Sequence, residues 1–251
     1  MSGHNKWSKI KNKKGADDVK KGNLYTKLTR EIIISAKEGG GNTESNFRLR
    51  LAIQKARDSN MPMDNIDRAI AKGTGTGESG SFEELTLEGY GPNGVAIMVS
   101  AMTDNRNRTV QEVRSSFTKH GGAMGENGCV AYMFKSRGVI TVNTEGANTD
   151  DLELAAIDAG AEDVNTGGGI MEVYTRPDTM EKVRAALEAA KLKVESSEIQ
   201  MVPETLVTLD EKGATQALKL IDRLEELDDV QNVYSNVDIP DSVMAAIQAA
   251  S

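Results

Sequence analysis

Lysine side chains crowd the first residues of the chain around its single tryptophan, Trp7. They are Lys6, Lys9, Lys11, Lys13 and Lys14. Ammonium groups neutralise phosphates and release condensed counterions, and an aromatic ring stacks on an unpaired base. The run therefore predicts a nucleic-acid-binding arm. A solubilising tail is the alternative interpretation of the same lysines.

The charge distribution supports a basic binding end on an acidic body. Residues 1–72 hold 16 Lys/Arg and 8 Asp/Glu, which leaves 14 Lys/Arg and 30 Asp/Glu in residues 73–251. The net charge of the whole chain is −8. The cations that continue the run beyond the arm, and that we expect to meet nucleic acid with it, are Lys20, Lys21, Lys27 and Arg30.

A second candidate for phosphate binding is the pair Arg106 and Arg108, in a polar segment between a predicted strand and a predicted helix. Two arginines beside a helix N-terminus can hold a phosphate through guanidinium and backbone N–H groups. In the alternative interpretation, Asn107 or Thr109 caps the helix and the arginines pair with neighbouring acids. Both interpretations stay open from the sequence.

Residues suited to catalysis or metal binding are few. One cysteine and two histidines exclude a disulfide framework and a multi-cysteine zinc site. Cys129 lies in an apolar strand-like run, typical of a small buried hydrophobe, and His120 at a helix end. A Cys129–His120 dyad would need a pairing in space that spacing does not show. We therefore predict no enzyme, no metal and no cofactor.

Two glycine-rich segments resemble phosphate-binding loops only in part. Gly75, Gly77 and Gly80 have the spacing of a dinucleotide fingerprint, but a helix precedes them and a strand follows, so we interpret residues 73–80 as a linker. Residues 121–128 lack the Gly-Lys-Ser/Thr ending of a P-loop. We expect that segment to be a contact loop.

The elements that position these residues follow from hydrophobic periodicity. Apolar stripes at helical spacing predict three short helices over residues 24–38, 44–58 and 62–72. Beyond residue 82, strand-like runs alternate with helices. The first group comprises strands 84–88, 95–102 and 129–134 with a helix over 107–120. The second comprises strands 139–142, 163–166, 170–175 and 194–201 with helices 150–159 and 179–190. A helix over 214–227 and a strand over 230–236 remain.

The order of the second group, β-α-β-β-α-β, is that of a ferredoxin-like unit, and the last helix and strand complete the first group. The predicted fold class is α+β, with an N-terminal three-helix bundle and two ferredoxin-like α/β domains, one inserted in the other. The limits are 1–22 for the basic arm, 23–79 for the bundle, 80–134 with 204–251 for the first α/β domain, and 135–203 for the inserted one.

Several stretches resemble the YebC/PmpR family. They are Gly3-His4-Asn5-Lys6-Trp7, Ile10-Lys11, residues 25–32, Glu88-Gly89-Tyr90-Gly91-Pro92, residues 103–109, and Lys119-His120-Gly121-Gly122 with Gly125-Glu126-Asn127-Gly128. The similarity runs from residue 3 to about residue 240. It departs at Asn5, where serine is usual, and at Asn12, in a basic or histidine position.

The resemblance implies three domains, as predicted above, in a cytoplasmic, non-enzymatic regulator of gene expression associated with nucleic acid. Family members are described as promoter-binding transcriptional regulators, and others as translation factors that help ribosomes at stretches such as consecutive prolines. We favour RNA at the ribosome, because the arm shows no recognisable helix-turn-helix and no clear dimerisation zipper implies that a palindromic operator is read. A flexible lysine arm with one aromatic residue suits irregular RNA better than a base-pair code.

DNA binding for transcription regulation at a promoter is the alternative, and an enzyme acting on a phosphorylated small molecule is a remote one. The acidic surface could also meet another protein. No apolar run approaches the roughly 18 residues of a membrane span. We expect a cytoplasmic monomer that binds ribosomal RNA or promoter DNA and no membrane.

Overall fold

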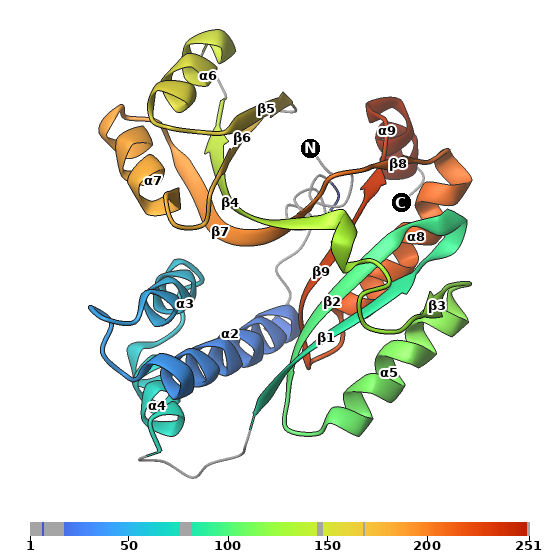
Figure 1. Cartoon of the computed structure of the whole chain (residues 1–251), viewed down its shortest axis with the longest axis horizontal. Coiled ribbons are helices and arrows are strands. Elements are labelled where there is room, and N and C mark those ends of the chain that lie inside the picture. The colour runs from blue at the N-terminus through green and yellow to red at the C-terminus, as the bar shows by residue number, and fades with distance from the viewer. Residues whose placement is uncertain (1–6, 8–17, 76–81, 145–147, 168, 250–251) are drawn as a thin grey trace.

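The structure is a computed structural model that describes Trp7 and residues 18–75, 82–144, 148–167 and 169–249 (Figure 1). The arm lysines Lys6, Lys9, Lys11, Lys13 and Lys14 lie outside the described residues, as do residues 76–81 of the predicted linker. Lys20 and Lys21 lie on a helix, but their side chains are not described.

Three helices form the N-terminal bundle, as the apolar stripes predict. They are α2 (Asp18–Gly39), α3 (Phe47–Asp58) and α4 (Met63–Gly73). Ile32, Leu49 and Ile66, one from each helix, are completely buried in their shared core. Helix α2 begins at Asp18, more than one helical turn before residue 24, where the sequence predicted the first helix to begin. The predicted limits of the arm and the bundle stay a prediction.

Gly73 belongs to this bundle and not to the linker. A Cβ atom at Gly73 would lie 2.4 Å from the backbone oxygen of Ile33 and 2.7 Å from the Cβ of Ala36. No real Cβ tolerates such distances to backbone, so only glycine lets the end of α4 approach α2 this closely.

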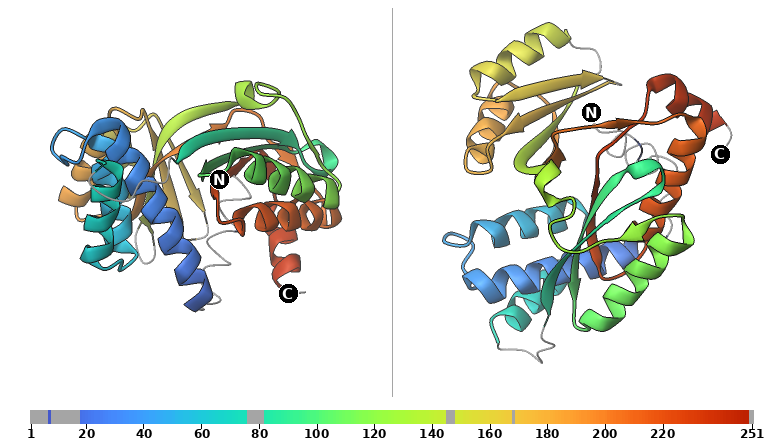
Figure 2. Two further views of the ribbon diagram at one scale, coloured as in Figure 1. Left: turned by 90° about the horizontal axis from the view of Figure 1, so that it is seen from below. Right: turned by 45° about the vertical axis from the view of Figure 1, so that its right-hand side comes forward.

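The first sheet has the strand order β3-β1-β2-β9, with every neighbouring pair antiparallel. Its strands are β1 (Glu83–Tyr90), β2 (Ala96–Thr103), β3 (Ala123–Met124) and β9 (Val230–Ser235). Helices α5 (Arg106–Lys119) and α8 (Glu211–Glu225) cover one face, seen together in Figure 2. Phe117 of α5 and Ile221 of α8 are completely buried against Ile97 of β2.

The segment predicted as a strand over 129–134 is not one. Residues 128–130 form turns, Ala131–Met133 form the short 3-10 helix η2, and a strand begins only at Phe134. The reason is the Glu88 carboxylate, which accepts the backbone N–H groups of Gly128, Val130 and Ala131 at 2.7, 2.8 and 2.8 Å. Donors held by one carboxylate are not available to a strand ladder. The short β3 takes the place of that strand at the sheet edge.

The second sheet has the order β5-β6-β4-β7, again antiparallel, with two helices that share its core. Its elements are β4 (Phe134–Asn143), α6 (Thr149–Asp158), β5 (Asp163–Gly167), β6 (Ile170–Thr175), α7 (Met180–Ala189) and β7 (Val194–Pro203). This is the predicted β-α-β-β-α-β order. The unit enters the chain between β3 and α8 of the first sheet, which confirms the predicted insertion.

Both sheets have the strand order of a ferredoxin-like unit, but the first is connected differently. In the first sheet, β1 lies between β3 and β2. It precedes both of them in the chain and forms a hairpin with β2 ahead of α5. The corresponding strand of the second sheet, β6, is the third strand of its unit. The 3-10 turn η1 (Pro92–Gly94) connects β1 to β2. Elements that the sequence did not predict include the short β3, the parallel pair β8 (Val207–Thr208) and β10 (Val237–Asp238), and helix α9 (Asp241–Ala249). Among the helices of the described residues, none has the length and apolarity needed to cross a membrane.

Candidate nucleic-acid interface

Helix α5 begins one residue earlier than predicted and has a different cap. The Asn105 side chain accepts the backbone N–H of Arg108 at 3.1 Å, and the Thr103 hydroxyl accepts the backbone N–H of Asn105 at 2.9 Å. Asn105 is therefore the N-cap, in place of the expected Asn107 or Thr109. The cap fixes the direction in which Arg106 and Arg108 leave the first turn.

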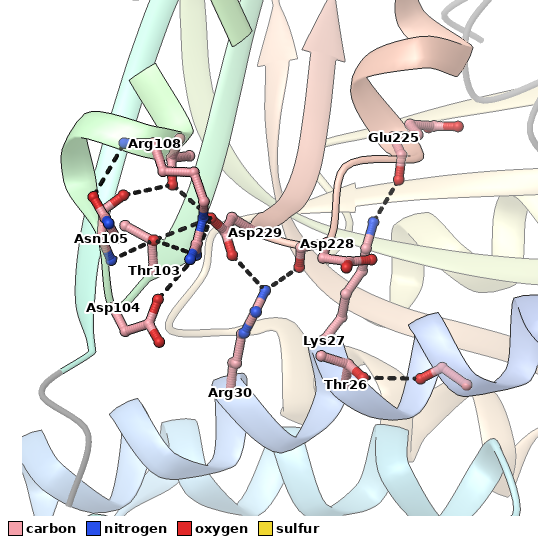
Figure 3. A network of polar contacts seen from close by, with 12 residues as sticks. Thr26, Lys27, Arg30, Thr103, Asp104, Asn105, Arg108, Glu225, Asp228 and Asp229 are labelled. Atoms are coloured by element: carbon pink, nitrogen blue, oxygen red, sulfur yellow. Dashed lines mark hydrogen bonds and ion pairs between the residues drawn. The ribbon is translucent and has the colours of Figure 1, made fainter. Parts of the chain in front are cut away.

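The buried carboxylate of Asp229, 3% exposed, collects the polar groups around that turn (Figure 3). One of its oxygens accepts the Thr109 hydroxyl at 2.6 Å, the Thr103 hydroxyl at 3.1 Å and Nη2 of Arg108 at 2.7 Å. Burial alone would raise the pKa of Asp229, but these hydrogen bonds and the nearby Arg30 charge outweigh it and lower the pKa. Asp229 is thus an ionised anchor for the start of α5.

Two of the predicted nucleic-acid contacts reach from α2 into this same region (Figure 3). Arg30 forms an ion pair with the other oxygen of Asp229 at 3.0 Å and donates to the carbonyl oxygen of Asp228. Lys27 donates through Nζ to the carbonyl oxygen of Glu225 at 2.6 Å. Burial lowers the pKa of Lys27, while the charges of Glu225 and Asp228 oppose that shift. Both cations hold the bundle to the end of α8.

Arg106 and Arg108 do not act as a pair. Arg108 donates to Asp104 at 2.9 Å as well as to Asp229, and this favours the interpretation in which the arginines meet neighbouring acids. The Arg106 side chain is 56% exposed, and its one ion pair within the described part of the chain is with Glu83, at 3.7 Å. Of the two, Arg106 retains a guanidinium that can reach a phosphate.

The exposed face of α5 carries further cations that the sequence interpretation did not single out. Arg114 and Lys119 form no ion pair among the described residues. A polar groove of about 650 Å³ between α5 and α8 is lined by Lys119, His120 and Arg223, among others. A second groove of about 550 Å³ places Arg106 and Arg114 opposite Gly125 and Asn127 of the contact loop.

That loop is held by β1. Besides the three N–H groups bound by the Glu88 side chain, the Glu88 carbonyl oxygen accepts the N–H of Gly125 at 2.8 Å, and the Tyr90 hydroxyl donates to the Cys129 carbonyl oxygen at 3.0 Å. Hydrogen bonds from the loop outweigh burial and lower the pKa of Glu88. Beyond the loop, Tyr132 is 69% exposed. An aromatic ring is thus presented to solvent from a rigid support.

Trp7 lies against the first sheet unit instead of projecting from the arm. Its indole Nε1 donates to a carboxylate oxygen of Asp222 on α8 at 3.0 Å, and its ring packs on the core beneath α5 and α8. In this position part of the ring is covered by protein. Only the uncovered part of the ring is then available for stacking on a base, the role predicted for Trp7.

The geometry does not support a Cys129–His120 nucleophile. Burial, together with the charge of Glu88, raises the pKa of the Cys129 thiol, which is the opposite of an activated cysteine. The His120 ring lies 2.8 Å from the carbonyl oxygen of Ser116, through Nδ1. The described residues contain no cluster of three or more His, Cys, Asp or Glu side chains suited to a metal ion.

Comparison with known proteins places these features in a family. A model described as the TACO1/YebC protein N-terminal domain matches residues 5–76, and one described as the TACO1/YebC second and third domain matches residues 82–237. A probable transcriptional regulatory protein of Dehalococcoides mccartyi strain CBDB1 is 57% identical over 244 residues, which is 97% of each chain.

A second relative, a probable transcriptional regulatory protein of Syntrophus aciditrophicus, is 52% identical over 99% of this chain and 100% of its own. Among solved structures, the crystal structure of a conserved hypothetical protein from Aquifex aeolicus is similar with a TM-score of 0.82 and 47% identity. The similarity covers 89% of this chain and 93% of that one. The arrangement of bundle and sheets is therefore shared with an experimentally solved structure.

Proposed function

The chain belongs to the TACO1/YebC family, and on that premise we propose that it is a non-enzymatic regulator of gene expression that binds RNA at the ribosome, in the cytoplasm. The observation that carries the proposal is the net charge of +8 in residues 1–72 beside −16 in the rest of the chain. Relatives named as probable transcriptional regulatory proteins support the regulatory role.

The contacts of the described cations support one choice of binding surface. Lys27, Arg30 and Arg108 are engaged by the protein itself, which leaves the arm lysines and the exposed cations of α5 for phosphate. Phosphate contacts position a protein on nucleic acid without reading its sequence. The proposed interface therefore comprises the arm together with Arg106, Arg114 and Lys119.

Two common modes of nucleic-acid recognition fit the structure poorly: stacking of bases on an open sheet, and insertion of a helix into a major groove. The face of the first sheet opposite α5 and α8 is covered, since Ala96 and Met98 are buried against Val130 and Phe134. Bases therefore cannot stack there as they do on an open four-stranded sheet. Helix α4, the second helix after a short turn, carries Asp64 and Asp67 against Arg68 and Lys72. It therefore lacks the excess of cations expected of a helix beside the phosphate backbone in a major groove.

Transcription regulation at a promoter remains the second candidate, because the relatives carry that name. Ultraviolet cross-linking in growing cells, with the chain purified under denaturing conditions, distinguishes the two. Our proposal expects attached RNA enriched in ribosomal sequences. Attached DNA enriched at promoters would replace it with the second candidate, and no attached nucleic acid would contradict both.

A further inference from the structure

Helix α6 of the inserted sheet unit presents two large apolar side chains to solvent. Leu154 is 59% exposed and Ile157 55% exposed, and among the described residues only Tyr132 is a more exposed large hydrophobic residue. Residues three apart on a helix are surface neighbours, so the two side chains form one apolar surface. The same helix already buries Leu152 and Ala156 in the core of the unit. Leu154 and Ile157 are therefore a second apolar face, which the described part of the chain leaves more than half exposed.

Acidic residues surround this pair. Asp150 lies four residues before Leu154, and Asp158 lies four residues after it. Glu153 lies four residues before Ile157. Each acid is thus one turn away along the same side of the helix. Asp150, Glu153 and Asp158 form no ion pair with another described residue. We call these five residues the α6 patch.

The elements packed beside α6 do not neutralise its charge. Helix α6 contains four acidic residues and no lysine or arginine. Helix α7 contains two residues of each sign, and its Arg184 is engaged by Glu181 and Glu188 at 3.0 and 2.9 Å. This leaves Lys182 as the unpaired cation of α7, against the four acids of α6. Strand β5 begins with a further acid, Asp163.

The chemistry of the α6 patch decides among its possible occupants. Contiguous exposed apolar side chains with a polar rim mark an interaction site. Nucleic acid and an anionic membrane surface are repelled by the carboxylates. A second copy bound about a two-fold axis would place the acidic rim against itself. A basic protein surface instead gains twice, because its cations meet the carboxylates and its apolar side chains cover Leu154 and Ile157.

We propose that the α6 patch binds a basic protein surface that carries apolar side chains between its lysines and arginines. Helix α6 lies at the outer edge of the molecule, on the opposite side from α5 (Figure 1). A protein bound there leaves α5 free for nucleic acid. The proposal uses no residue of the proposed nucleic-acid interface, so it gives the acidic body of the chain a role of its own.

The test is a titration of the full chain against a fluorescently labelled helical peptide, with leucines along one face and lysines at its other positions. One comparison peptide has serine for each leucine, and another has glutamate for each lysine. We expect the leucine–lysine peptide to bind at least tenfold more tightly than either, which corresponds to about 1.4 kcal/mol. Equal binding of the serine peptide would show charge attraction alone, and equal binding of the glutamate peptide would show apolar contact alone. Either result would overturn the proposal.

Variants of the chain locate the binding. Leu154→Ser combined with Ile157→Ser should weaken binding of the leucine–lysine peptide at least tenfold. Leu206→Ser, at a leucine that is 46% exposed outside α6, should leave it unchanged. Circular dichroism of each variant verifies that the fold is retained. Equal affinities of the α6 variant and the control would overturn the proposal.

The acidic rim has its own matched pair of variants. Glu153→Gln combined with Asp158→Asn should weaken peptide binding and reduce its dependence on salt. Asp64→Asn combined with Asp67→Asn removes two charges from α4 and should change neither. Equal effects of the two variants would show attraction to the acidic body as a whole and would overturn the proposed site.

Cross-linking in growing cells tests the same surface with its natural partner. The chain would carry a photo-cross-linking amino acid at position 154, and each adduct would be identified by mass spectrometry. We expect a protein with a basic surface. An adduct to a second copy or to nucleic acid, or the absence of any adduct, would overturn the proposal. The peptide titrations contain no nucleic acid, so the proposed function can fail without affecting them.

Discussion

Asp229 joins three parts of the chain through one buried carboxylate: α2 through Arg30, the end of β2 through Thr103, and the first turn of α5 through Thr109 and Arg108. A carboxylate in this environment is stable only while its partners are present. In the sequence, Asp228-Asp229 looks like an ordinary acidic pair in a turn. Spacing gave no signal that residues 121 and 199 positions away would converge on it.

Asp229→Ala should destabilise the protein by about 3 kcal/mol, because it leaves Arg30 and Arg108 without their shared acid. We take the lower part of the usual range because the Arg108 side chain is 43% exposed and water can reach it. Urea unfolding measures the change. Asp178→Ala is the matched control, since its exposed ion pair with Arg176 should contribute less than about 1 kcal/mol. Equal effects of the two variants would contradict the anchoring role.

The lowered pKa of Asp229 also predicts how stability depends on pH. Because the folded pKa lies below the unfolded value of about 3.9, the unfolded state binds more protons between the two values. The stabilisation is complete above the unfolded pKa and is lost as pH falls through the folded pKa. The unfolding free energy would be measured at a series of acidic pH values. It should rise less steeply with pH for Asp229→Asn than for the natural chain. Glu88, whose pKa is also lowered, should supply much of the remaining slope.

At the scale of elements, Glu88 determines that residues 128–131 form a loop instead of a strand. Glu88→Gln keeps one acceptor oxygen and removes the charge that supports three N–H bonds. A hydrogen bond to a charged group contributes about 1.5–3 kcal/mol. Hydrogen exchange at Gly128, Val130 and Ala131 should therefore accelerate at least about tenfold. Exchange as slow as in the natural chain would show that the loop is held by something else.

The contact between α2 and α4 gives a second prediction for an element. Gly73→Ala forces a Cβ against the Ile33 backbone and should cost about 1–3 kcal/mol of unfolding free energy, the usual cost of overpacking. Gly22→Ala provides the control, because nothing lies within 4 Å of its Cβ and alanine is the better helix former. Denaturant midpoints should therefore move in opposite directions. A shift of the same sign in both variants would contradict the close approach.

Sequence periodicity found most elements because their apolar stripes are long, as in α2, α8 and β2. The failure at residues 129–134 has a physical cause: an apolar run of strand-like residues met a buried carboxylate from β1, and the hydrogen bonds to that carboxylate prevailed. The N-cap of α5 was missed because three residues near its start, Asn105, Asn107 and Thr109, are all of types that cap helices. Helix α9 is apolar and lies beyond the last predicted strand, where no incomplete unit required a further helix.

For the whole molecule, the nucleic-acid site stays a prediction, and the structure limits which cations can belong to it. The composition shows a surplus of cations in residues 1–72. It does not show which of these cations bind other parts of the protein and which remain free on the surface. Lys27 and Arg30 fasten α2 to the end of α8, and Trp7 lies on Asp222 of the same helix. Each contact joins residues about 200 positions apart, which no local pattern reveals. The limits predicted for the two α/β domains stay a prediction.

We propose that phosphate contacts of the basic arm drive nucleic-acid binding, and a salt titration is the sharpest test of this proposal. Binding of a single-stranded ribosomal RNA fragment would be measured for the natural chain and for Lys11, Lys13 and Lys14 changed together to Ala. The control is a variant that loses the same three positive charges elsewhere on the surface. In it, the exposed lysines of the inserted sheet unit are changed together to Ala: Lys182, Lys191 and Lys193. We predict that the arm variant weakens binding and flattens the log–log salt dependence by about two to three units, while the control keeps the natural slope. An arm variant with unchanged affinity and slope would contradict the claim.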